Sequence, residues 1–69
     1  MREFFSLECK ERKKLPVFIW DCMAQADRNA QRNGNRPGVV LHELGKDHDE
    51  DIVMIRYSDF RKMLKEEEK

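Results

Sequence analysis

The chain has 69 residues, and 14 lysine and arginine side chains balance 14 aspartate and glutamate side chains. A chain of this length forms one domain at most, and none of its apolar runs is long enough to cross a bilayer. The zero net charge excludes proteins that bind nucleic acid tightly through charge alone. Hydrophobic burial and chain entropy nearly cancel at this size, so we expect a partner subunit, a metal ion or a further segment to stabilise the domain.

The charge is unevenly distributed along the chain. Residues 1–36 carry eight basic and five acidic side chains, a balance of +3, whereas residues 37–69 carry six basic and nine acidic ones, a balance of −3. Oppositely charged halves attract each other, either within one molecule or between two copies.

The first predicted element is a strand over residues 4–10. Its apolar and polar residues alternate, and successive side chains of a strand point to opposite faces. One face then carries the apolar set and the other the polar set, namely Phe5, Leu7 and Cys9 against Ser6, Glu8 and Lys10.

A helix is predicted from Pro16 to about Arg32. Proline suits the first helical turn, apolar residues recur every three to four positions, and Gly34 suits a left-handed cap after the helix. Trp20 belongs to this apolar stripe and is expected in the core. If the sheet leaves its side of the helix uncovered, we expect Trp20 to anchor a dimer instead.

Two short apolar runs, residues 39–42 and 52–57, predict strands joined as a hairpin by a polar, acidic turn. Because the first run is nearly continuous, we expect that strand to be covered on both faces. Ser58 is predicted to cap a closing helix. The order β-α-β-β-α indicates a small α/β fold in which helices pack on a three-stranded mixed sheet with two open edges.

The hairpin turn gathers residue types that bind zinc, namely His42, Glu43, Asp47, His48 and Asp49. On a regular strand His42 and Glu43 project to opposite faces, so they cannot share one ion without a bulge. We therefore expect a solvated acidic turn rather than a zinc site.

Three consecutive basic residues, Arg12, Lys13 and Lys14, form a candidate nucleic-acid contact, and a solvated turn is the alternative interpretation. Cys9 and Cys22 have neither metal-ligand nor redox-motif spacing. Two unpaired thiols and the lack of a secretory leader or a membrane segment predict a cytoplasmic protein.

The order of these motifs resembles the second half of the PD-(D/E)XK, or restriction-endonuclease-like, nuclease fold. Within that superfamily it resembles small Holliday-junction-resolvase-like proteins of phages and bacteria. The similar segments cover nearly the whole chain and are residues 5–10, 23–26, 36–42 and 57–60.

The resemblance implies a metal-dependent nuclease acting on branched or duplex DNA. Glu8 corresponds to the family's metal-binding carboxylate, Lys10 to the lysine that orients or polarises the attacking water, and Gln25 to a helix glutamine that faces the site. The implied cofactor is Mg²⁺, which activates water and neutralises charge on the phosphate.

The sequence departs from the family at its start. The family's first catalytic aspartate lies upstream of the Glu-X-Lys motif, but only seven residues precede Glu8. Glu3 is an odd number of positions from Glu8 and projects from the opposite face of a regular strand. Since one carboxylate binds Mg²⁺ weakly, we expect residues 1–69 to form a single truncated nuclease-like domain with an incomplete or degenerate site, or a half-site completed by another chain.

Two alternatives remain open. The open sheet edges, the marginal stability and the missing half-site favour a non-catalytic module that forms a homodimer and binds DNA or another protein. A small cytosolic α/β domain without any site is the second alternative, and the sequence does not separate it from the first.

Overall fold

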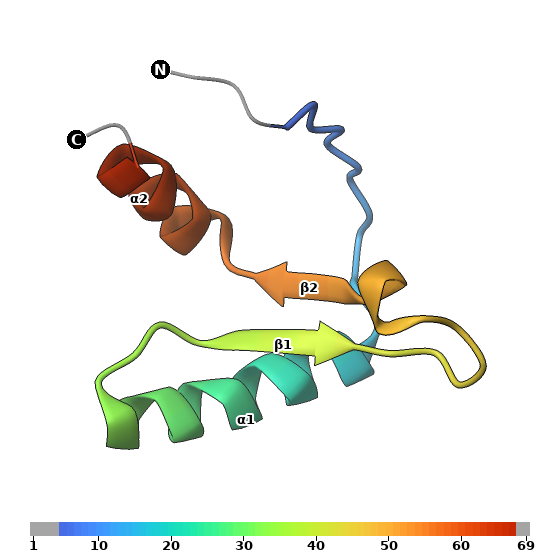
Figure 1. Cartoon of the computed structure of the whole chain (residues 1–69), viewed down its shortest axis with the longest axis horizontal. Coiled ribbons are helices and arrows are strands. Elements are labelled where there is room, and N and C mark those ends of the chain that lie inside the picture. Colours follow the sequence, from blue (N-terminus) through green and yellow to red (C-terminus); the bar gives the residue numbers. More distant parts are fainter. Residues whose placement is uncertain (1–4, 68–69) are drawn as a thin grey trace.

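The protein is described by a computed structural model over residues 5–67, in which two helices flank a β-hairpin (Figure 1). Helix α1 lies beneath strand β1 and runs in the opposite direction, and helix α2 leaves the far end of strand β2. The elements are α1 Val17–Asn33, β1 Gly38–Leu41, the short 3₁₀ turn η1 His48–Glu50, β2 Ile52–Ile55 and α2 Tyr57–Glu67.

Helix α1 begins and ends where the sequence predicts. Pro16 is the residue just before the helix, and its carbonyl accepts a hydrogen bond from the Ile19 N–H at 3.0 Å. Gly34 ends the helix with φ of 70°, and its N–H donates to the Ala30 carbonyl. A left-handed backbone costs glycine little because glycine has no Cβ, so this residue closes the helix without strain.

The predicted hairpin is confirmed, but the prediction that its first strand is covered on both faces is wrong. β1 and β2 pair antiparallel, with Val40 opposite Val53 and Leu41 opposite Ile52. Directly paired residues share a face, and Val40 and Val53 are 63% and 65% exposed. The burial of β1 therefore alternates, as in a sheet packed on one side only.

The predicted three-stranded mixed sheet is wrong, because the sheet of the described residues has two antiparallel strands. Residues 5–10 have no regular secondary structure, and Phe4 lies outside the described residues. An isolated alternating pattern does not make a strand, since each strand needs a neighbour that accepts and donates its backbone hydrogen bonds. The small α/β class remains, with the order α-β-β-α for the described elements.

The segment before α1 is placed by an aromatic contact rather than by strand pairing. The ring centroids of Phe5 and Phe60 lie 5.6 Å apart with an interplanar angle of 59°, a tilted geometry that aromatic pairs favour. The segment therefore runs from the start of α1 past the hairpin to α2 (Figure 1).

Helix α2 starts two residues earlier than predicted, because a cap at Ser58 would make Asp59 the first helical residue. Its range begins at Tyr57, and the Phe60 N–H donates to the Arg56 carbonyl at 3.0 Å. Ser58 therefore lies inside the first turn and does not cap the helix, which makes that prediction wrong. Asp59 does lie in the first turn, as expected, where the helix dipole favours an acidic side chain.

Two bidentate ion pairs join distant parts of the chain. The Arg56 guanidinium donates to both carboxylate oxygens of Asp27 at 2.6 and 2.8 Å, and so joins the β2–α2 junction to α1. Arg36 donates to both carboxylate oxygens of Glu66 at 2.6 and 3.1 Å, and so joins the α1–β1 connection to the end of α2. Bidentate pairs of this kind fix orientation as well as distance.

The hydrogen bond from Arg56 lowers the pKa of Asp27 below its ordinary value. A lowered folded-state pKa stabilises the fold above the pKa of the unfolded aspartate, and this stabilisation is lost as the pH falls through the folded-state value. We therefore expect Asp27→Asn to lower the urea midpoint at pH 7, and expect this difference to vanish in strong acid.

Asp21→Asn, on the exposed surface of the same helix, is the matched control and should leave the urea midpoint unchanged. An Asp27→Asn midpoint equal to that of the native chain at pH 7 would show that the ion pair does not stabilise the fold.

Candidate functional site

Glu8 and Lys10, the two residues of the predicted nuclease motif, lie close together. Nζ of Lys10 is 3.7 Å from Oε2 of Glu8, so the acidic and amino groups do project together. They do so from an irregular segment, and their side chains are 84% and 82% exposed. An ion pair this exposed is screened by water and holds neither group in one position.

The third predicted residue, Gln25, lies on a different surface. It lines a shallow hollow between α1 and the start of β1, together with Cys22, Asn29 and Val39. Among the described residues, no hydrogen bond or ion pair joins Gln25 to Glu8 or Lys10, and the hollow includes none of the segment that carries them. The geometry thus brings together two of the three residues that the resemblance implied.

The candidate nucleic-acid contact formed by Arg12, Lys13 and Lys14 is exposed throughout. It stays a prediction, since both a DNA contact and a solvated segment need exposed basic side chains.

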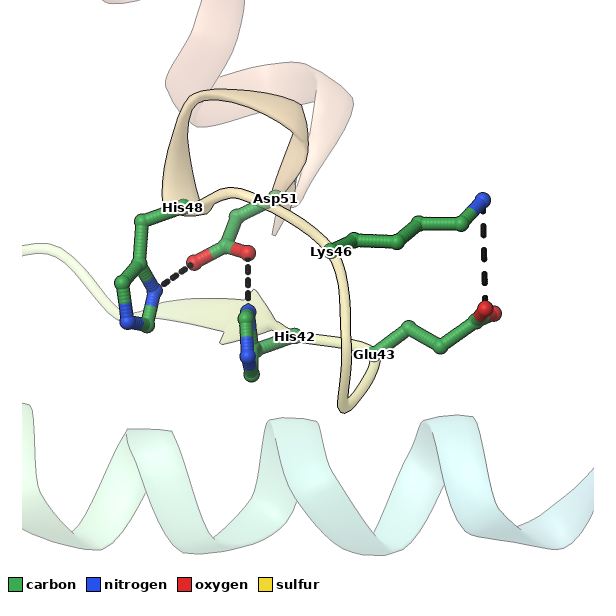
Figure 2. Close-up of polar contacts among 5 residues, drawn as sticks. All are labelled: His42, Glu43, Lys46, His48 and Asp51. Carbon is green, nitrogen blue, oxygen red and sulfur yellow. Dashed lines mark hydrogen bonds and ion pairs between the residues drawn. The ribbon is translucent and has the colours of Figure 1, made fainter.

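Metal-ligand side chains gather at the hairpin turn instead. The nitrogen and oxygen ligand atoms of His42, His48 and Asp51 all lie within 4.8 Å of one another. Glu43 is turned away, as predicted, and its carboxylate lies 3.8 Å from Nζ of Lys46 (Figure 2). Among residues 5–67, these three residues form the group in which at least three possible metal ligands lie close together, and Glu8 does not belong to it.

Sequence reasoning found both histidines but missed Asp51. The hairpin register supplies the missing signal: Val40 pairs with Val53 and Leu41 with Ile52, so the next position along places His42 opposite Asp51. A prediction of strand register, rather than of strands alone, was needed to pair these two residues.

Large apolar side chains crowd the beginning of α1. We call this group the α1 apolar surface, and it consists of Leu15, Val17, Phe18 and Trp20. Their exposed fractions run from 40% for Leu15 to 71% for Val17, and Trp20 is 55% exposed. The sheet therefore leaves Trp20 largely uncovered, which is the condition under which the sequence predicts this residue as a dimer anchor.

Few apolar side chains are buried among the described residues. Met23 and Ala30 are the buried hydrophobic residues of the described chain, at 3% and 8% exposed. The accessible surface is 6725 Å², whereas a compact monomer of 8.3 kDa exposes about 4,600 Å². The radius of gyration is 13.9 Å, against about 11 Å for a compact domain of this length.

Comparison with known proteins finds no matching family model, no similar curated protein and no similar solved structure. The resemblance to the PD-(D/E)XK nucleases therefore stays a prediction. No helix within residues 5–67 combines the length and the apolar character needed to span a membrane.

The exposure of Glu8 gives a direct test of the nuclease prediction. A lone, solvated carboxylate binds Mg²⁺ weakly, because Mg²⁺ keeps its waters unless several oxygens are held in octahedral geometry. We expect a titration with millimolar Mg²⁺ to leave the amide NMR signals of residues 8–10 without saturable shifts. Saturable shifts that disappear in Glu8→Gln would instead support the nuclease-like metal site.

Proposed function

We propose that this protein is a non-catalytic interaction module that functions as a homodimer and uses the α1 apolar surface as its contact. The observation that carries the proposal is the exposure of four large apolar side chains at the beginning of α1 and just before it. Clusters of exposed apolar groups are typical of protein interfaces, and Trp is the residue type most enriched at their energetic centres.

The size of the excess surface supports a partner chain. The protein exposes about 2,100 Å² more than a compact monomer of its mass. Obligate homodimers bury about 1,000 Å² or more on each subunit, so one such interface fits within the excess. Small domains that cannot fill a core by themselves commonly gain their stability in this way.

The charge distribution favours a second copy as the partner. Residues 10–14, just before the α1 apolar surface, carry four basic side chains and one acidic side chain. Residues 43–51 of the hairpin turn carry five acidic side chains and one basic side chain. In a two-fold dimer a contact between these segments is made twice, so one chain supplies both halves of the complementary pair.

The nuclease-like function has less support from the geometry. Glu8 and Lys10 are solvated, Gln25 lies in a separate hollow, and the cluster of metal-ligand residues at the hairpin turn does not include Glu8. A contact with DNA through Arg12, Lys13 and Lys14 is compatible with a dimer, since two-fold symmetry would present the basic segment twice.

The proposal predicts a dimer in sedimentation equilibrium at tens of micromolar chain, with a mass twice the 8.3 kDa of the chain. Trp20→Arg should shift the protein to the monomer, because a buried charge without a partner at the interface centre is costly. A monomeric native chain at this concentration would contradict the proposal.

Met63→Arg is the matched control. Met63 is 47% exposed on α2 and lies outside both the α1 apolar surface and the two charged segments, so an apolar-to-arginine change there should leave the dimer intact. If both variants dissociate the dimer equally, the α1 apolar surface is not its specific contact.

A further inference from the structure

We infer that His42, His48 and Asp51 form a binding site for one divalent transition metal ion of the zinc class. Two imidazole nitrogens and one carboxylate oxygen are a ligand set that zinc sites with an open coordination position use. The inference does not rest on the proposed dimer, because all three residues come from one hairpin of one chain.

The carboxylate of Asp51 bridges the two imidazoles, with one oxygen at the Nδ1 atom of each ring (Figure 2). Its Oδ1 is 2.6 Å from Nδ1 of His42, and its Oδ2 is 3.1 Å from Nδ1 of His48. An ionised carboxylate only accepts hydrogen bonds, so both Nδ1 atoms carry the donated hydrogens in this arrangement. Both Nδ1 atoms are therefore already turned toward the same carboxylate. A metal ion would take the place of the two donated hydrogens, and each neutral ring would then carry its hydrogen on Nε2.

The distances suit an ion with short bonds to nitrogen and oxygen. Zinc bonds of 2.0 to 2.2 Å at tetrahedral angles separate neighbouring ligand atoms by about 3.3 Å. The ligand atoms here lie within 4.8 Å of one another, so a movement of about 1.5 Å at most brings every pair to that spacing. The side chain of His48, which is 82% exposed, is free to make this movement.

The backbone holds the ligands in this arrangement without the ion. The last strand pair is Leu41 with Ile52, and His42 and Asp51 are the residues next to it at the turn. The 3₁₀ turn η1 is closed by a hydrogen bond of 3.0 Å from the Asp51 N–H to the His48 carbonyl. Gly45 has φ of +92°, which lets the chain reverse between the two histidines. The imidazole rings stack with centroids 4.2 Å apart. Such preorganisation reduces the entropy lost when an ion binds.

The electrostatic surroundings favour a cation. Besides Asp51, the turn carries the carboxylates of Glu43, Asp47, Asp49 and Glu50, against the single ammonium of Lys46. That ammonium is held by Glu43 on the other side of the turn (Figure 2). The turn therefore attracts a divalent ion from solution, and the Lys46 ammonium lies away from the two imidazoles.

The ligand chemistry separates this site from the predicted magnesium site. Mg²⁺ prefers oxygen ligands and octahedral geometry, whereas imidazole suits zinc, cobalt, nickel and copper. With three protein ligands, a tetrahedral ion keeps one position for water or for a donor group of a bound molecule.

Cobalt(II) is the probe of choice, because its visible spectrum reports both the geometry and the ligand type. We expect one Co²⁺ per chain to bind saturably with the absorption of a tetrahedral or five-coordinate nitrogen and oxygen site, without a thiolate charge-transfer band. Zn²⁺ should displace it, millimolar Mg²⁺ should not, and Zn²⁺ should shift the amide NMR signals of residues 42–51. A thiolate band would assign the ion to Cys9 or Cys22 and overturn the inference.

His48→Ala should weaken Co²⁺ binding at least tenfold, since the site loses one of three ligands. The side chain is exposed, so this variant should keep the circular dichroism spectrum of the native chain. Asp51→Asn gives a second, independent test of the same ligand set. Asp21→Asn is the matched control, because it makes the same change as Asp51→Asn at an exposed position of α1 outside the hairpin turn, and it should bind as tightly as the native chain. Binding that is unchanged in His48→Ala and in Asp51→Asn would overturn the inference.

Discussion

The architecture depends on the bidentate ion pair between Arg56 and Asp27. Arg56 lies where β2 passes into α2, and Asp27 lies on α1. Together with the Arg36–Glu66 pair, this contact fixes the position of α2 relative to α1. In larger proteins, an apolar core fixes the positions of the helices relative to one another. Here Met23 and Ala30 are the buried hydrophobic residues of the described chain, so polar contacts on the surface define the arrangement. Because both partners are partly solvated, water and salt weaken the pair, and the fold is held loosely.

The same shortage of core explains the exposed apolar surface. One two-stranded hairpin is too small to cover all sides of α1, and large apolar side chains at the first turn of that helix remain exposed. One face of the hairpin is also uncovered, and Val40 and Val53 lie side by side on it. Two-stranded hairpins are marginal by themselves and gain stability from a further layer. Association with a second copy would supply that layer without a longer chain, which connects the weak fold to the proposed function.

The cluster of metal-ligand side chains at the hairpin turn forms independently of this small core. Its histidines and Asp51 come together through backbone geometry, namely strand register and a 3₁₀ turn, and not through burial. A metal ion bound there would cross-link the two strands at the turn end of the hairpin and stabilise the folded state over the unfolded one. Both proposals would therefore offset the small apolar core, the dimer through contacts between chains and the metal ion through contacts within one hairpin.

The sequence by itself determined the local elements. Pro16 and Gly34 bounded α1, and two apolar runs around a polar turn specified the hairpin, because these signals act through the backbone of neighbouring residues. The prediction of a strand over residues 4–10 was wrong, because an alternating pattern does not supply the pairing partner that a strand requires. The contact between Phe5 and Phe60 places that segment instead. Tertiary structure alone left Trp20 uncovered and set His42 opposite Asp51, because burial and register depend on what lies across space and not along the chain.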